Sequence, residues 1–195
     1  LSNFASTDSD TYTVKFTPSG SGATTINIAA NVYTDANSNN NTASAEFNWT
    51  TDITAPVVTS VTSFVANSSY GVGSEIPIYI LFDDDVTVSG TPQLTLETGG
   101  SDVVVNYTSG TNSSSLIFTY TVGSGENSSD LDYASTGALA LNGGTINDAA
   151  GNAATLTLAT PGAAGSLSSA KNIIIDTTAP APTMTAVDAD GNAVA

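Results

Sequence analysis

The clearest structural signal in the chain is the stretch Glu75-Ile76-Pro77-Ile78-Tyr79-Ile80-Leu81-Phe82. Three isoleucines and a phenylalanine occupy its alternate positions. Because successive side chains of a β-strand point to opposite faces of the sheet, these four residues lie on one face. The stretch therefore predicts a strand that buries one face in a hydrophobic core.

The same period of two residues recurs along most of the chain. Shorter alternating runs occupy residues 12–16, 26–32, 45–49, 94–96, 103–107, 116–122, 156–158 and 173–175. Clusters of Gly, Asn, Asp, Ser and Pro separate these runs, as turns require. No stretch has the period of a long helix. The pattern predicts an all-β protein built as an antiparallel β-sandwich.

The charge balance excludes several classes of function. The chain has 18 acidic residues and only two lysines or arginines, which gives a net charge of −16, and it has neither His nor Cys. Because the surface cannot neutralise phosphates, we expect no nucleic-acid partner and no binding to anionic membranes. Without His and Cys the chain cannot build zinc, iron–sulfur or haem sites, or a histidine-based triad. Carboxylate and amide oxygens remain, and these are ligands that suit calcium.

One segment of the sequence occurs twice. Asp52-Ile53-Thr54-Ala55-Pro56 returns as Asp176-Thr177-Thr178-Ala179-Pro180, 176 − 52 = 124 residues later. A turn rich in Asp and Asn lies upstream of each copy, at residues 35–39 and at residues 148–152. Because a Pro after a strand ends the ladder and stiffens the chain, each copy predicts a hinge between domains.

These hinges divide the chain into three parts. We expect residues 55–176 to form one complete β-sandwich of ordinary size. Residues 1–54 hold about three predicted strands, too few to close a sandwich of roughly seven. We interpret them as the C-terminal half of a domain, which is either incomplete or completed by a neighbouring chain. Residues 177–195 are predicted to begin a following domain.

Short motifs in a fixed order carry a family resemblance. They are Thr54-Ala55-Pro56-Val57-Val58, Tyr70-Gly71-Val72-Gly73, Gly90-Thr91-Pro92-Gln93-Leu94-Thr95-Leu96, Asp130-Leu131-Asp132-Tyr133, Leu141-Asn142-Gly143-Gly144-Thr145-Ile146, Asp148-Ala149-Ala150-Gly151-Asn152 and the second hinge. Together they resemble the bacterial immunoglobulin-like repeats of large secreted, calcium-binding surface adhesins of the RTX-adhesin type. Residues 1–54 are similar to the C-terminal half of a related type, through Leu1-Ser2-Asn3-Phe4, Tyr12-Thr13-Val14 and Phe47-Asn48-Trp49-Thr50.

The resemblance implies tandem immunoglobulin-like (Ig-like) antiparallel β-sandwich domains with calcium at their junctions. The sequence departs from the family pattern at Ser38, where the pattern has Gly, and at Ile53, where it has Thr. Residues 83–85 are three consecutive acids, more than the family carries there. This last departure should strengthen the binding of a cation.

The candidate calcium ligands are acids and amides near the two hinges. The strand after the first hinge leaves it and the next strand returns, so the acids of residues 83–85 should lie near Asp52. The same reasoning, applied to antiparallel neighbours, places residues 148–152 near Asp176 and residues 35–39 near Asp52. The full predicted set is Asp35, Asn37, Asn39, Asp52, Asp83, Asp84, Asp85, Asp148, Asn152 and Asp176. The alternative is that these residues only form Asx turns and solvated loop tips.

The expected function is structural rather than enzymatic. Paired acids on loop tips lack the substrate cleft and the raised pKa that glycoside hydrolysis needs. No apolar run approaches the length of a membrane span, so we expect no direct membrane insertion. We expect a rigid segment of an extracellular cell-surface adhesin, whose partners are neighbouring Ig-like repeats and a receptor on a host or other surface. The alternative is a subunit of a self-assembling extracellular filament or matrix fibre, in which identical subunits are joined by strands that one lends to another.

Overall fold

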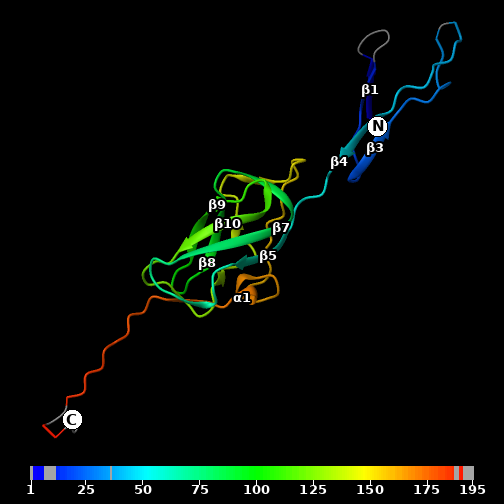
Figure 1. The fold of residues 1–195 in the computed structure, drawn as a ribbon. Coiled ribbons are helices and arrows are strands. Elements are labelled where there is room, and N and C mark those ends of the chain that lie inside the picture. Colours follow the sequence, from blue (N-terminus) through cyan, green and yellow to red (C-terminus); the bar gives the residue numbers. More distant parts are fainter. Residues whose placement is uncertain (1, 7–11, 36, 187–188, 191–195) are drawn as a thin grey trace.

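The computed structural model describes residues 2–6, 12–35, 37–186 and 189–190. The chain is all-β and its sheets are largely antiparallel, as the period of two predicts (Figure 1). The one described helix, α1 (Leu167–Ala170), is a single turn, and the Ser166 side chain caps it by accepting the Ser169 N–H. In the part of the chain that the structure describes, no helix has the length and apolar character that a membrane crossing requires.

The largest sheet lies within residues 55–176, which we call the core unit. Its strands follow the order β12 (Asp132–Tyr133), β8 (Gln93–Glu97), β9 (Val103–Ser109), β10 (Ser113–Thr121), β7 (Glu75–Ser89) and β14 (Thr145–Asn147). Two further strands join it: β5 (Val58–Ser63) pairs with β7, and β13 (Leu139–Ala140) pairs with β8. A smaller sheet contains β11 (Asn127–Ser128), β15 (Ile173–Asp176) and β6 (Ser68–Tyr70), and within it β15 runs parallel to β6.

The hydrophobic core belongs to the core unit alone among the described residues. In β7 the alternate residues from Ile76 to Phe82 are between 0% and 5% exposed, which confirms the prediction from this stretch. They form one cluster with alternate residues of β8 and β10, among them Leu94 and Leu116. These residues are apolar at every second position, so the sheet can bury one face while its edges and loops carry the polar residues.

The strand β7 is irregular where its acidic residues lie. On the β10 side, Ser115 pairs with Leu81 but Ser113 pairs with Val86. Thus 115 − 113 = 2 positions on β10 lie opposite 86 − 81 = 5 positions on β7. Residues 83–85 lie in this bulge and are exposed. Because a bulge re-aims side chains, three acids can leave the core face without ending the strand. The alternating stretch predicts a strand over residues 75–82, but β7 continues through the acids to Ser89 and pairs there with β14.

Two hairpins make up the described part of residues 1–54. One pairs β1 (Ser2–Ser6) with β2 (Tyr12–Lys15), and the other pairs β3 (Gly22–Ile26) with β4 (Phe47–Thr51). The rings of Phe16 and Phe47 lie against Trp49, with centroids 5.2 and 5.3 Å away. Phe47 is nevertheless 68% exposed, so this aromatic group has no core to enter within the described residues.

Two of the predicted strands do not form. The strand β3 ends at Ile26, and the described residues between it and β4 form no strand, although Thr34 and Asn40 make an isolated bridge. Residues 156–158 also lie outside any strand, although Leu158 is buried. A run of alternating residues becomes a strand only where another strand supplies a ladder of hydrogen bonds.

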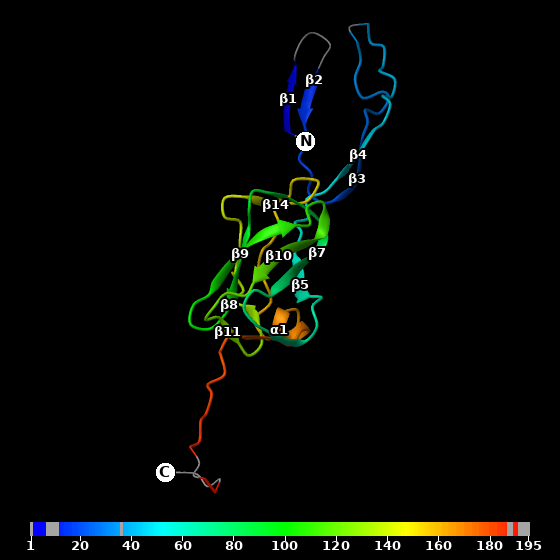
Figure 2. The ribbon, with the colours of Figure 1, turned by 60° about the vertical axis from the view of Figure 1, so that its left-hand side comes forward.

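The two ends of the described chain leave the core unit on opposite sides. In both ribbon views the hairpins lie beyond one end of the core unit and the C-terminal segment extends from the other (Figures 1 and 2). Residues 177–186 form no strand, and the predicted beginning of a further domain stays a prediction. Part of that predicted region, residues 187–188 and 191–195, lies outside the described residues.

Candidate metal centre

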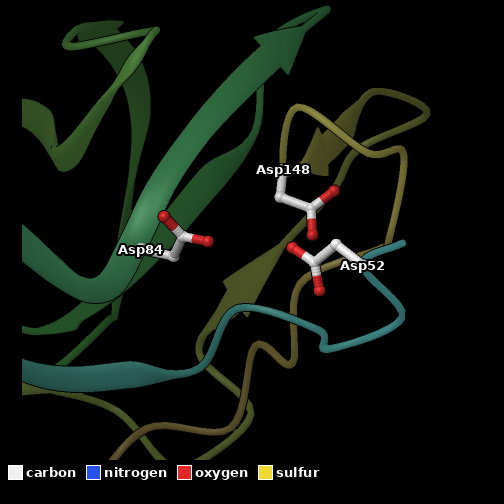
Figure 3. A group of neighbouring side chains, drawn as sticks. All are labelled: Asp52, Asp84 and Asp148. Carbon is white, nitrogen blue, oxygen red and sulfur yellow. The ribbon is translucent and has the colours of Figure 1, made fainter. Parts of the chain in front are cut away.

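Three aspartates from distant parts of the sequence converge at one end of the core unit. Asp52 precedes β5, Asp84 lies in the bulge of β7, and Asp148 follows β14 (Figure 3). Each offers a carboxylate oxygen, and these atoms all lie within 4.8 Å of one another. Calcium binds oxygens at about 2.3–2.6 Å, so two ligands on opposite sides of one ion lie about 5 Å apart. The spacing therefore suits a single calcium ion between the three carboxylates.

A tight loop holds Asp148 in its charged form. The Asp148 side chain accepts the backbone N–H of Asn152 at 2.8 Å and the Asn152 side-chain amide at 2.7 Å. Burial disfavours the charge of this carboxyl, but hydrogen bonds from the Asn152 side chain and from the backbone N–H groups of residues 150–152 favour it, and the pKa of Asp148 lies below its ordinary value. The carboxylate is thus ionised and positioned before any cation arrives.

Asp52 belongs to the first linker, by which we mean residues 52–56. Its side chain accepts the backbone N–H of Thr54 at 2.9 Å, which is an Asx turn, and the Ser21 hydroxyl at 3.0 Å. Its backbone carbonyl accepts the side-chain amide of Asn152 at 3.2 Å. The first linker is therefore bound on one side to the β3–β4 hairpin and on the other to the core unit.

The three neighbouring acids of β7 have different surroundings. Asp84 accepts the N–H of Asp85 at 2.7 Å and points toward Asp52 and Asp148 (Figure 3). Asp83 instead exchanges two hydrogen bonds with Val57: its side chain accepts the Val57 N–H and its own N–H reaches the Val57 carbonyl. Of residues 83–85, only Asp84 belongs to the group of three carboxylates.

The predicted position of residues 148–152 is wrong. We placed Asp148 and Asn152 near Asp176, but they lie at the first linker. The reason is the strand order: β14 pairs with the outer end of β7, and Thr155 then bridges Val57 in parallel instead of pairing with β15.

Asp176 lies at the opposite end of the core unit. It pairs with Asn127, and its carbonyl lies beside Gly71, just before the start of β7. Asp84 stands 84 − 75 = 9 positions further along β7 than Glu75. At about 3.3 Å per residue, this is at most about 30 Å of strand, because the bulge shortens the path. Asp176 therefore takes no part in the group of three.

The predicted position of residues 35–39 is also wrong. In the β3–β4 hairpin, Gly22 pairs with Thr51 next to Asp52, and Ile26 pairs with Phe47 at the other end. Residues 35–39 lie within the loop beyond that far end, so the hairpin separates Asp35, Asn37 and Asn39 from Asp52. Their own contacts are local, for the Asp35 side chain accepts the N–H groups of Asn37 and Asn39.

Sequence reasoning missed two residues that fix the linkers. At the first linker, the Ser21 hydroxyl accepts the Ile53 N–H at 2.9 Å and lies 2.9 Å from the Thr54 hydroxyl. At the second linker, which is residues 176–180, the Asn127 side chain accepts the Thr177 N–H at 3.0 Å and the Thr178 hydroxyl at 3.2 Å. The signal that could have found them is the strand register, since Asn127 pairs with Asp176, and Ser21 and Asp52 are the neighbours of the paired residues Gly22 and Thr51.

Comparison with known proteins returns nothing for this chain. No protein-family model, no curated protein and no solved structure matches it. The resemblance of the short motifs therefore stays a prediction.

Proposed function

We propose that this chain is a segment of an extracellular cell-surface adhesin, built from tandem Ig-like β-sandwich units and stiffened by calcium at their junctions. The observation that carries the proposal is the group formed by Asp52, Asp84 and Asp148. One of these aspartates belongs to the linker and two belong to the unit that follows. A cation between them would tie the linker to that unit.

The donor set favours calcium among the common metal ions. The three side chains offer only hard oxygen ligands, and calcium completes a shell of six to eight oxygens with carbonyls and water. Like charges at this separation repel one another unless a cation lies between them. Calcium would thus replace a repulsion at the linker with an attraction, and the linker would become stiffer.

The recurrence of the linker contacts supports the tandem arrangement. Both linkers open with an Asx turn, from Thr54 to Asp52 and from Thr178 to Asp176. One further side chain fixes each linker: Ser21, just before β3, at the first and Asn127, in β11, at the second. Residues 1–54 and the core unit therefore end in the same local geometry. Successive units of a tandem array are expected to join their linkers with the same local geometry.

The decisive experiment measures calcium binding to the intact chain by isothermal titration calorimetry. We expect saturable binding that Asp84→Asn weakens strongly. The matched control is Asp85→Asn, which removes the same charge from the adjacent exposed position outside the group of three. Equal calcium affinity in both variants, or no binding by the wild-type chain, would contradict the proposal.

A second candidate function is a subunit of a self-assembling extracellular filament. The observation that favours it is the set of large apolar side chains left exposed in the described part of residues 1–54, namely Ile28, Val32, Tyr33, Phe47 and Ile53. Contact with an identical subunit would bury them. This function predicts ordered polymers of the purified chain, and a strictly monomeric sedimentation profile over a wide concentration range would count against it.

A further inference from the structure

The described residues of the loop 35–39 make the same hydrogen bonds as their counterparts in the loop 148–152. In both, the first aspartate accepts the N–H and the side-chain amide of the asparagine four positions later. In both, the N–H of the aspartate returns to the carbonyl of that asparagine, at 3.0 and 3.1 Å. The fourth residue has a positive φ, 65° at Ser38 and 91° at Gly151, and an isolated antiparallel bridge flanks each loop. Ser38 therefore adopts the left-handed conformation that Gly151 adopts at the equivalent position.

The loop of residues 148–152 binds the first linker through groups that need no cation. The Asn152 side-chain amide donates to the carbonyl of Asp52 at 3.2 Å. Three residues after Asn152, the N–H of Thr155 donates to the carbonyl of Pro56 at 2.8 Å, and Thr155 forms a parallel bridge with Val57. The segment Asp-x-Thr-Ala-Pro is thus bound by a loop that starts with Asp, has Asn four positions later, and is followed by Thr seven positions after the Asp.

The loop of residues 35–39 carries the same three residue types at the same positions, Asp35, Asn39 and Thr42. All three line a hollow of about 310 Å³, together with Tyr33, Asn40 and Asn41. The Asn39 amide donates to Asp35, whereas the equivalent amide of Asn152 also donates to the linker. Among the described residues, the hydrogen bonds of Asp35 and Asn39 are all made within residues 35–39.

The second linker has the features by which the first linker is bound. It opens with the same Asx turn as the first linker, because the Thr178 N–H donates to the Asp176 side chain at 3.0 Å. Residues 178–186 are exposed and form no strand. Its sequence again has Asp, Thr, Ala and Pro where the first linker has them.

We propose that the hollow beside Asp35 binds the second linker, residues 176–181, of another copy of this chain. This inference rests on the proposed function, because it extends the contact proposed at the first linker to a second site. In the complex, the Asn39 side-chain amide donates to the carbonyl of Asp176, and the Thr42 N–H donates to the carbonyl of Pro180. Asp35 and Asp176 then lie close together, so calcium strengthens the contact. No counterpart of Asp84 stands in the described hairpins, and the contact is therefore weaker than the one within the chain.

The test uses a fluorescent synthetic peptide of residues 176–186, titrated with the intact chain and followed by anisotropy. We expect saturable binding that is tighter in calcium than in EGTA. Asn39→Ala should weaken it about tenfold, as expected for the loss of one hydrogen bond to the peptide and of the bond that shapes the loop. The matched control is Asn152→Ala, the same change in the loop that is already bound, which should leave peptide binding unchanged.

A second measurement on the wild-type chain avoids any effect of substitution on folding. Amide hydrogen exchange with and without the peptide should show new protection at residues 33–42, the Thr42 N–H included. Protection confined to residues 148–155, or no anisotropy change at any concentration, would overturn the inference. Calcium titration of Asp84→Asn tests the first linker separately, so this inference and the proposed function can fail independently.

Discussion

The two linkers of this chain have nearly the same sequence and the same local conformation but different surroundings. Residues 52–56 and 176–180 both open with an Asx turn, and Ser21 and Asn127 fix them in the same way. Among the described residues, the first linker alone meets two further carboxylates, Asp84 and Asp148, and the Asn152 amide. Local sequence therefore sets the conformation of a linker, whereas its chemistry depends on residues brought to it from elsewhere in the chain.

The largest effect should come from removing the buried ligand at the first linker. We expect Asp148→Asn to lower calcium affinity at least 100-fold. Mutation of a residue that only hydrogen-bonds to a metal ligand lowers metal affinity about 10–100-fold, and loss of the ligand itself should lower it more. Asp176→Asn, the equivalent loss of charge at the second linker, should leave the affinity of the intact chain unchanged. Calorimetric titration of both variants would test the comparison, and a similar loss in both would break it.

Calcium removal should lower the stability of the core unit. An ion present at about 100 times its dissociation constant adds about 2.7 kcal/mol to the folded state. For a chain of this size, that corresponds to a change of about 5–10 °C in the melting temperature. Differential scanning calorimetry in calcium and in EGTA measures it. The shift should disappear in Asp84→Asn, and a shift of equal size in that variant would place the stabilising ion elsewhere.

The side chains that fix the two linkers should differ in importance. We expect Asn127→Ala to speed amide hydrogen exchange at Thr177 about fivefold, as loss of about 1 kcal/mol of hydrogen bonding implies. Ser21→Ala should speed exchange at Ile53 by less, because Asn152 still holds the first linker through the Asp52 carbonyl. A larger effect at Ile53 than at Thr177 would show that the core unit does not help to hold the first linker.

The smallest effect should be a loss of stability in acid. The pKa of Asp148 is lowered in the folded chain, so its charge stabilises the fold above the ordinary pKa of an aspartate, about 3.9, and this contribution is lost as the pH falls through the lowered value. The same holds for Asp35, whose hydrogen bonds from Asn39 lower its pKa. We expect both carboxyls to titrate below the ordinary pKa of an aspartate in NMR experiments. A pKa of Asp148 at or above that ordinary value would contradict the role given to its loop.

Much of the fold could be predicted because the residues that form the buried face of a strand lie close together in the sequence, at every second position. The alternation in residues 75–82 predicted β7 and its buried face, and the Pro at position 56 marked the point where a linker meets a strand. The predicted approach of Asp84 to Asp52 is confirmed, since it needs only the return of the next strand.

The rest could not be predicted because it depends on which strand lies beside which. The pairing of β14 with β7 carries Asp148 to the first linker, and no local pattern encodes that choice. The alternation in residues 26–32 failed for a related reason. Ile28 and Val32 are 47% and 60% exposed, since no partner strand or core lies beside them among the described residues.

The parallel pairing of β15 with β6 has a mechanical consequence. The first linker would pull β5 along its own axis from one end of the core unit, and the second linker would pull β15 along its axis from the other end. Tension along the chain would thus load the hydrogen bonds of each pair together, in shear, rather than unzip them one after another. We expect the core unit to resist stretching with a distinct force peak when single molecules are pulled by their ends, and a smooth, gradual extension would contradict this.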